Sequence, residues 1–588
     1  MSTEGGDPWP ADPTPRKPQG VVGGSSKKPQ EKQKAAKKAS SSQSPKSDLT
    51  MEVKKVLASV VGAEVDAITL DSEAADIGID SLMGIELLRE VNSAFHCKLD
   101  LPELLAATTV GNIVTLVASA LSQGAVEIAD DDDHDDDADD DVNDSRPTTS
   151  TSASELDSAT SGVDSPPIKD IHSEEQTKRD VTAREAEAER YVAEYTAGWT
   201  PAQPSYTGEA IAGSHDAVII VTGATGSLGA HVVAALASNP SVKTVVCLNR
   251  HRPTPVETRQ DDAFSSRGIA LTPEARSKLR ILATDSSQPR LGLEASEYQW
   301  LTQHGSHIVH SAWPLSGSRP MSAFAPQFQV MRNLLDLARD MAVHRRVGFQ
   351  MVSSLSVVGH AKERLVPEDR VHMDSVLPPG YGEAKWVCER MLDETLHKHP
   401  ALFRAMAVRP AQIAGSATSG VWNSVEQIPF IVKSAQSLGA WPNFRGTVRW
   451  IPVDAVAAIL VDLLYIGDDK TAPDPWPIYH IDDPVGRPWE EISSVLADAL
   501  DIPAGQFMPF KEWLDTVARS SKPETENPAG RLVDFLEQNF ERLSCGGLVL
   551  DTTKAQEHST AMRALAPVSA EVARGYIRAW KEMGFLAS

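Results

Sequence analysis

The sequence predicts a multidomain chain, with a small all-α bundle followed by a larger α/β domain that has a doubly wound parallel sheet and a smaller mixed subdomain. Two observations predict this order. Near the front, apolar residues recur at helical spacing over about 75 residues, whereas beyond residue 216 short apolar runs alternate with amphipathic stretches. Strands separated by helices in this way favour parallel βαβ units.

Composition divides the chain into four segments. The first is rich in Pro, Gly, Ser and Lys, and we expect it to be disordered because it has too few large apolar side chains to offset its ordering entropy. It resembles an interdomain linker, so we expect the chain to be the tail of something larger. The predicted ranges are 1–48 for this segment, 49–123 for the bundle, 124–184 for an acidic Ser/Thr-rich linker and 185–588 for the α/β domain. Within the α/β domain, the core is expected over about 215–415. The mixed subdomain and the C-terminal helices are expected over about 416–588.

The formal net charge of −25 argues against a nucleic-acid partner, which would favour a basic surface. Ten aspartates lie between Asp130 and Asp141, and this run predicts a self-repelling, extended spacer. A calcium site is the weaker interpretation, because the run has no turn glycine and no fixed register of ligands.

The four cysteines are widely scattered and show no metal-ligand spacing, so we expect no metal site and a reducing compartment, the cytoplasm. No apolar run approaches the roughly 18–20 residues of a membrane span, so no membrane association is expected.

Periodicity predicts the elements themselves. Three apolar sets predict the helices of the bundle, namely Val53 to Val61, Leu82 to Phe95 and Val110 to Leu121. A charged helix over Glu174 to Tyr195 leads into the α/β domain. The predicted strands of that domain are Ala217–Val221, Thr244–Leu248, Arg280–Leu282, His307–Val309, Phe349–Val352 and Ala405–Val408.

Ser81 follows Asp80 and opens the second helix of the bundle. A phosphodiester on its side-chain oxygen would lie beside free backbone N–H groups and the positive end of the helix dipole. An ordinary N-cap is the alternative role for either residue. The run from Asp76 to Leu87 is similar to acyl carrier domains of fungal non-reducing polyketide synthases, and the similarity extends over the whole bundle. This resemblance implies that Ser81 carries 4′-phosphopantetheine.

A glycine-rich loop follows the first predicted strand of the α/β domain. It reads Gly223-Ala224-Thr225-Gly226-Ser227-Leu228-Gly229 and leads into a helix. Its glycines let the backbone approach a pyrophosphate, which the helix N-terminus then holds. The loop between strand and helix predicts a Rossmann-type dinucleotide site.

The second strand ends at Asn249-Arg250, and no acidic residue occurs between Ser241 and Val256. An acid at that place would bind the ribose 2′-hydroxyl of NAD, whereas Arg250 can pair with a 2′-phosphate. The sequence therefore favours NADPH, with a solvated loop arginine as the alternative.

Tyr381 and Lys385 are four residues apart, so they share one face of a helix. An adjacent ammonium would lower the pKa of the tyrosine, as proton transfer near neutral pH needs. Ser354 comes just after a predicted strand, where its hydroxyl can reach the same carbonyl oxygen; Ser353 and Ser356 are alternatives. By itself, a YxxxK spacing is also compatible with a helix-surface pair.

Together with the glycine loop, these residues resemble the extended short-chain dehydrogenase/reductase family, in which Ser354 best matches the catalytic serine. That resemblance alone implies that Asp285, after the third strand, contacts adenine. Closer matches are to thioester reductase domains over roughly residues 185–585, although the Ser/Pro-rich stretch 315–328 departs from an Asn-rich family segment. These matches are His310–Trp313, Arg409–Gly415, Trp422-Asn423 and Trp450–Asp454. Trp313 and Trp450 are candidates for the lining of a pantetheine tunnel or for core residues.

The resemblance implies that an acyl chain on the carrier is reduced by NADPH and released as an aldehyde. The expected partners are the acyl thioester, a phosphopantetheinyl transferase, and upstream ketosynthase and acyltransferase domains in cis or in trans. Four alternatives stay open: a peptide synthetase-like context, a carboxylic acid reductase, non-redox cyclising release, and a non-enzymatic scaffold or cofactor sensor. The acyl group, the choice between aldehyde and alcohol, and the oligomeric state cannot be read from the sequence.

Overall fold

The computed structural model describes two regions of the chain. In the first region it describes residues 45–61 and 107–124 together with single positions between them. In the second it describes residues 169–205, 216–314, 319–465 and 477–588, apart from Pro253 and Pro379. Ser81, the glycine-aspartate-serine run around it, and the acidic spacer lie outside the described residues.

The described part of the first region is helical, as the apolar periodicity predicts. Helix α1 covers Pro45–Val61 and α4 covers Val110–Gly124. Val53 and Leu57 of α1 are fully buried in one apolar cluster with Ile113 and Val117 of α4. Between them, the described residues from Leu87 to Phe95 are helical too, and Leu87 and Val91 join the same cluster.

The second region is built on a seven-stranded parallel sheet in the order β12-β7-β5-β4-β1-β2-β3. The strand order reverses between β1 and β4, which is the switch point where doubly wound sheets bind their ligands. The strands are β1 Ala217–Thr222, β2 Val242–Arg250, β3 Leu279–Thr284, β4 His307–His310, β5 Val347–Val352, β7 Phe403–Pro410 and β12 Ile478–Ile481.

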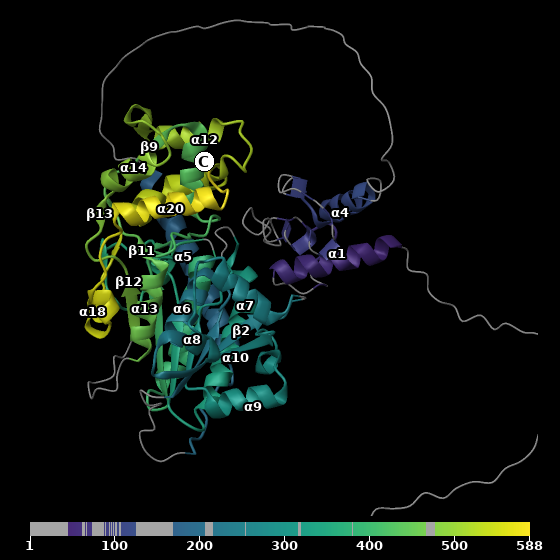
Figure 1. The fold of residues 1–588 in the computed structure, drawn as a ribbon. Coiled ribbons are helices and arrows are strands. Elements are labelled where there is room, and N and C mark those ends of the chain that lie inside the picture. Colours follow the sequence, from purple (N-terminus) through teal and green to yellow (C-terminus); the bar gives the residue numbers. More distant parts are fainter. Residues whose placement is uncertain are drawn as a thin grey trace, which may run out of the picture. The chain divides into compact units, whose positions relative to one another are not determined.

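Helices cover both faces of the sheet, which is why the central strands β1, β4 and β5 are buried along their whole length. Val218 and Ile220 of β1 face one core, and Ile219 and Val221 face the other. Helices α6 Ser227–Ser238 and α13 Val453–Leu464 lie side by side on one face (Figure 1). The opposite face carries α5 Lys169–Thr196, α9 Ala295–His304, α10 Ala325–Met341 and α11 Tyr381–Glu394.

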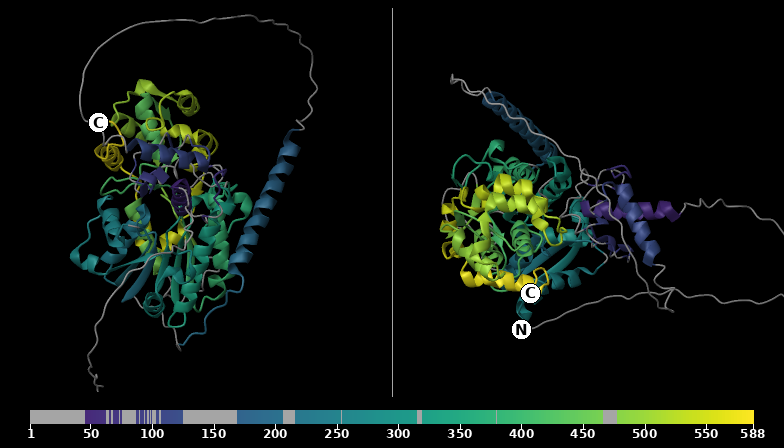
Figure 2. Two further views of the ribbon diagram at one scale, coloured as in Figure 1. Left: turned by 90° about the vertical axis from the view of Figure 1, so that its right-hand side faces the viewer. Right: turned by 90° about the horizontal axis from the view of Figure 1, so that it is seen from above.

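A third apolar cluster forms the smaller subdomain. It is unusually rich in tryptophan, and Trp441, Trp489, Trp513 and Trp580 are all essentially inaccessible. Its C-terminal helix, α20 Ala570–Glu582, lies at the yellow end of the colour scale in Figure 2 and packs against α14 Trp489–Asp498. The main helices are α12 Gln427–Leu438, α14 Trp489–Asp498, α15 Phe510–Arg519 and α20 Ala570–Glu582.

Short elements complete this second region. The short helices are α7 Val256–Ser265, α8 Pro273–Ser277, α16 Val533–Phe535, α17 Glu541–Ser544, α18 Thr553–His558 and α19 Thr560–Arg563. The short strands are β6 Leu365–Val366, β8 Ile413–Ala414, β9 Trp441–Asn443, β10 Thr447–Val448, β11 Ile451–Pro452, β13 Arg487–Pro488, β14 Phe507–Pro509 and β15 Val549–Leu550.

The predicted fold class is confirmed, and all six predicted strands are present with slightly wider bounds. The seventh strand, β12, was missed because it is four residues long and includes His480, which is buried. Helix α5 is continuous from Lys169 to Thr196, so the boundary predicted at 184/185 falls inside a helix. Within the described ranges, no helix is long and apolar enough to cross a membrane.

Candidate active site

The glycine-rich loop between β1 and α6 is shaped for close approach of a ligand to the backbone. Gly223 has φ +71°, and a Cβ on it would lie 2.7 Å from the Ala312 nitrogen. A Cβ on Gly229 would lie only 2.0 Å from the carbonyl oxygen of Gly223. Side chains at these positions would therefore clash with backbone, and only glycine lets the loop turn this tightly.

The N-terminus of α6 is available to an anion. Gly226 is its N-cap and supplies no side-chain hydrogen bond, so the first N–H groups and the helix dipole face the cavity that the loop borders. The predicted loop residues Gly223, Thr225, Gly226, Ser227, Leu228 and Gly229 all line this cavity. Their arrangement fits the pyrophosphate of a dinucleotide.

Arg250 and Asp285 line the same cavity from the ends of β2 and β3. Asp285 accepts hydrogen bonds from the backbone N–H and hydroxyl of Ser287, which fix its carboxylate. Sequence reasoning missed Arg259 of α7, which also lines the cavity and donates to the carbonyl oxygen of Arg250 at 2.5 Å. Only folding reveals it, since nine residues separate the two arginines and no motif links them.

Ser354 and Tyr381 meet on the other side of the switch point. Ser354 follows β5, and its hydroxyl accepts hydrogen bonds from the Ser356 N–H at 3.1 Å and the Ser356 hydroxyl at 2.9 Å. The Ser354 hydroxyl also forms a hydrogen bond with Tyr381, the first residue of α11. Because Ser356 donates both of the other bonds, the Ser354 proton is free to be donated to Tyr381. Both side chains border the cavity.

Lys385 lies one turn farther along α11 and is almost fully buried. Its Nζ donates to the carbonyl oxygen of Val352 at 2.8 Å and lies 3.9 Å from the centre of the Trp313 ring. Burial lowers the pKa of Lys385 to about 7, although the negative charge of Glu389 opposes this shift.

The predicted fall in the tyrosine pKa is wrong for this structure. Burial raises the pKa of Tyr381 to about 12, and the hydrogen bond from Ser354 offsets only part of that increase. The ammonium that was expected to favour tyrosinate is itself disfavoured by the same desolvation. Tyr381 is therefore a neutral phenol near pH 7 and can donate a hydrogen bond.

The structure separates the three candidate serines. Ser353 is buried and its hydroxyl donates to Oε1 of Glu389 at 2.5 Å, so this hydroxyl is held by the Glu389 carboxylate although the residue also borders the cavity. Ser354 faces Tyr381, and Ser356 donates to Ser354. The two tryptophans differ as well, because Trp313 lines the cavity whereas Trp450 is 2% exposed within the third cluster.

A buried ion pair between Glu389 of α11 and Arg409 of β7 lies next to the Ser353 side chain. This pair was not predicted from the sequence. Glu389, one turn after Lys385, receives two hydrogen bonds from Arg409 of β7, at 2.9 and 2.6 Å. Arg409 also donates to the carbonyl oxygen of Asp369 at 2.9 Å. The pair and Ser353 together join the end of β5, helix α11 and strand β7.

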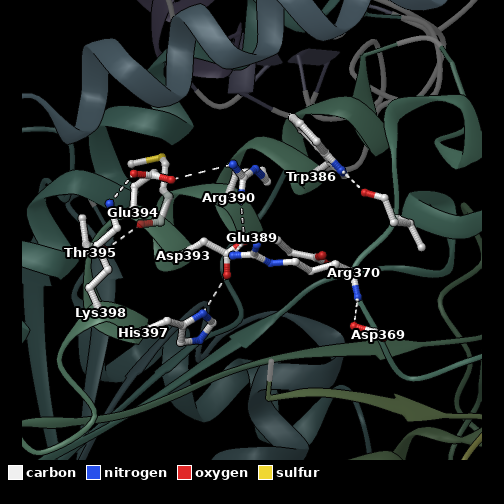
Figure 3. Close-up of polar contacts among 12 residues, drawn as sticks. Asp369, Arg370, Trp386, Glu389, Arg390, Asp393, Glu394, Thr395, His397 and Lys398 are labelled. Carbon is white, nitrogen blue, oxygen red and sulfur yellow. Dashed lines mark hydrogen bonds and ion pairs between the residues drawn. The ribbon is translucent and has the colours of Figure 1, made fainter. Parts of the chain in front are cut away.

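The second half of α11 is held by further polar contacts (Figure 3). Arg390 pairs with Asp393 at 2.9 Å, and Asp393 also binds Nδ1 of His397 at 2.8 Å. Trp386 donates its indole N–H to the carbonyl oxygen of Val371 at 2.9 Å. These contacts fix the helix that presents Tyr381 and Lys385.

Two known protein families match parts of this chain. Residues 221–460 match the NAD-binding family described as male sterility protein, and residues 52–117 match the phosphopantetheine attachment site family. The first match contains the glycine loop and the Ser354–Tyr381–Lys385 set. The second contains Ser81.

Curated relatives are long fungal synthases. A non-reducing polyketide synthase of Aspergillus terreus is 55% identical over 435 residues, covering 70% of this chain and 16% of that protein. The iterative polyketide synthase afoE of Emericella nidulans is 56% identical over 425 residues, covering 68% of this chain and 15% of that protein. The chain thus spans about one sixth of the length of these relatives.

Two solved structures share the fold. The terminal R domain from the myxalamid PKS-NRPS biosynthetic pathway has a TM-score of 0.55 at 24% identity, covering 68% of this chain and 98% of that one. A thiolation-reductase di-domain from an archaeal non-ribosomal peptide synthetase has a TM-score of 0.51 at 13% identity, covering 93% of this chain and 99% of that one.

The second region is a Rossmann-type domain of the NAD-binding family described as male sterility protein, and it is preceded by a domain of the phosphopantetheine attachment site family. The curated sequence relatives include fungal proteins named non-reducing polyketide synthases.

Buried Lys385 should leave a signature in the pH dependence of stability. Its folded-state pKa of about 7 is below the unfolded value of about 10.4, so the unfolded state binds more protons between these pH values. The free energy of unfolding should therefore gain up to about 1.4 kcal/mol per pH unit from this group as the pH rises from 7 to 9. Lys385→Met should remove that gain in urea unfolding at pH 7, 8 and 9.

The matched control is Lys362→Met, since the Lys362 side chain is 82% exposed. This variant should keep the wild-type slope. Identical slopes for wild type and Lys385→Met would contradict the buried, deprotonating amine.

Proposed function

We propose that this chain reduces an acyl thioester held on its own carrier domain, using NADPH, and releases the acyl group as an aldehyde. The observation that carries the proposal is that Ser354, Tyr381 and Lys385 border one cavity with the glycine-rich loop. A chain that also has a phosphopantetheine attachment domain brings its own thioester to such a site.

The residues of the site act on the thioester oxygen. A reduced nicotinamide, when bound, supplies the hydride that converts the thioester carbonyl to a hemithioacetal, which collapses to an aldehyde and a free thiol. Tyr381 and Ser354 donate hydrogen bonds to the oxygen as negative charge develops there, and Tyr381 supplies the proton. The high pKa of Tyr381 keeps the phenol protonated before the reaction. Lys385 would hold the ribose of a bound nicotinamide dinucleotide and, when protonated, would stabilise the tyrosinate that forms.

The choice of NADPH rests on charge at the end of β2. Arg250 lines the cavity there, Arg259 lies beside it, and no acidic residue occurs between Ser241 and Val256. Guanidinium groups suit a 2′-phosphate, whereas NAD-binding sites use a carboxylate at this place. Asp285, at the end of β3, is the proposed adenine contact.

The carrier half of the proposal rests on Ser81 as the attachment point of 4′-phosphopantetheine. Tethering raises the effective concentration of the thioester toward millimolar, depending on the reach of the linker. The acidic segment between α4 and α5, residues 125–168, is the proposed spacer between the carrier domain and a reductase domain that begins at helix α5. A phosphopantetheinyl transferase would load the arm, and ketosynthase and acyltransferase domains would build the chain. The four free cysteines support a reducing compartment such as the cytoplasm.

The alternative release mechanism, cyclisation without reduction, is disfavoured by the complete Ser354, Tyr381 and Lys385 set. A non-enzymatic scaffold or cofactor sensor is disfavoured for the same reason, because it would not require these three side chains. Reduction in a peptide synthetase or a carboxylic acid reductase would use the same site, and the polyketide synthases among the relatives favour a polyketide chain.

Removal of the Tyr381 hydroxyl should abolish reduction. Tyr381→Phe should lower kcat at least about 100-fold, the usual contribution of a positioned acid, while NADPH still binds. The rate is measured by NADPH absorbance with a synthetic acyl-pantetheine thioester, and binding by NADPH fluorescence. Tyr465→Phe, which alters a tyrosine outside the cavity lining, serves as the control. Full turnover by Tyr381→Phe would remove this residue from the mechanism.

Loss of Arg250 should weaken the preference for the phosphorylated dinucleotide. In Arg250→Ser, KM for NADPH should rise at least about tenfold, because a hydrogen bond to a charged group is lost, and KM for NADH should change little. Arg519→Ser, on an 83% exposed side chain, is the control. Equal effects on both dinucleotides would argue against contact with the 2′-phosphate.

Ser81 is tested by mass spectrometry. Incubation with a phosphopantetheinyl transferase and coenzyme A should add one phosphopantetheine to the wild-type chain and none to Ser81→Ala. Ser119→Ala, an exposed serine of α4, should be modified like the wild type. A mass gain that persists in Ser81→Ala would place the attachment elsewhere.

A further inference from the structure

One carboxyl group in the wall of the active-site cavity has no part in the mechanism above. Glu426 precedes α12 and occupies its N-cap position, yet its side chain makes no capping hydrogen bond. It lines the cavity that Ser354 and Tyr381 also border. Its carboxyl is therefore not used to close the helix and is presented at the cavity wall.

The carboxyl is anchored to a rigid aromatic wall. The indole N–H of Trp422 donates to Oε2 of Glu426 at 2.8 Å. Trp422 is 2% exposed and its ring lies 5.1 Å from those of Trp450 and Tyr576. Trp580 in turn donates to the carbonyl oxygen of Trp422 at 2.9 Å. Because this cluster is packed on all sides, the position of the carboxyl is set before any ligand arrives.

No lysine or arginine within the described residues forms an ion pair with Glu426. Burial raises the pKa of the Glu426 carboxyl to about 7, although the hydrogen bonds from Trp422 and Asn423 lower it in part. Near neutral pH the group is thus present both as carboxylate and as carboxylic acid. A partially buried group of this kind is costly unless a ligand or water meets its remaining hydrogen-bonding capacity.

The neighbours of Glu426 belong to the substrate half of the cavity. The dinucleotide loops follow β1, β2 and β3, whereas Gln412 follows β7 and Gln427 begins α12. Gln427 donates to Oε1 of Gln412 at 2.6 Å, and Phe430 adds an apolar surface to the same wall. A polar strip beside an aromatic surface fits a flat chain that carries oxygen substituents.

We propose that Glu426 binds a hydroxyl group of the acyl chain and thereby selects hydroxylated, phenolic or enolic acyl thioesters over unsubstituted ones. This inference rests on the proposed thioester reduction and names the substrate class of that site. A hydroxyl can donate to the carboxylate and accept from the carboxylic acid, so it matches both protonation states of Glu426. A site built to bond a hydroxyl discriminates strongly against the analogue that lacks it, because its polar group is left unpaired.

The test compares two substrates in four proteins. The substrates are 2,4-dihydroxybenzoyl and benzoyl pantetheine thioesters, and kcat/KM for each is measured by NADPH absorbance. Wild type should prefer the dihydroxy thioester at least about tenfold, in line with one hydrogen bond to a charged group. The ratio should fall to about one in Glu426→Leu and lie between these values in Glu426→Gln. The control Glu491→Gln, an exposed carboxylate on α14 of the same subdomain, should keep the wild-type ratio.

A second measurement does not need turnover. Calorimetry gives the dissociation constants of the corresponding pantetheine amides, in which nitrogen replaces the thioester sulfur. The dihydroxy amide should bind wild type at least about tenfold more tightly than the benzoyl amide, and Glu426→Leu should remove the difference.

Unchanged ratios in Glu426→Leu would overturn the inference. An equal loss with both thioesters would overturn it too, since the carboxyl would then act at the reacting centre or on the fold. If wild type oxidises no NADPH with either thioester, the proposed reduction fails, while the amide ratios still decide the role of Glu426.

Discussion

The buried Glu389–Arg409 pair is the interaction on which the geometry of the site depends. Arg409 is fully buried on β7, and Glu389 lies on α11 one turn after Lys385. Ser353 donates to the same carboxylate, so the pair fixes the residue next to the catalytic serine candidate. Loss of one partner would leave an uncompensated charge in the core, which typically costs about 3–5 kcal/mol. Such a pair allows one arrangement of β5, α11 and β7, and this arrangement brings Ser354, Tyr381 and Lys385 together.

Helix α5 fixes the other end of α11. Arg184 of α5 pairs with Glu383, two residues after Tyr381, and donates to the carbonyl oxygen of Val376 at 2.9 Å. Glu383 also accepts from the backbone N–H of Gly380 at 2.9 Å and so closes the first turn of α11. The helix that leads into the α/β domain therefore packs directly on the helix that carries the tyrosine. Preorganisation of this kind is what electrostatic stabilisation of a developing oxyanion requires.

Much of the fold could be predicted because burial on both faces of a parallel sheet leaves a signal in the sequence. Strands such as Ala217–Thr222 and Val347–Val352 are continuous apolar runs, and few other structures produce them. Strand β12 gives no such signal, because Tyr479 and His480 interrupt its four residues and its neighbours are rich in Pro and Asp. The tyrosine pKa was mispredicted for a related reason: proximity to a lysine follows from spacing, whereas the depth at which both groups are buried does not.

The sequence by itself determined what lies within one or two turns of chain: the glycine loop between a strand and a helix, and the pairing of Tyr381 with Lys385 on one helix face. It also determined the arginine at the end of β2. Only the tertiary structure decided which serine faces the tyrosine, that Arg259 joins Arg250, and that Glu426 reaches the cavity of Ser354. These relations join residues that are distant along the chain, and they arise from packing of helices on a sheet, which no local pattern encodes.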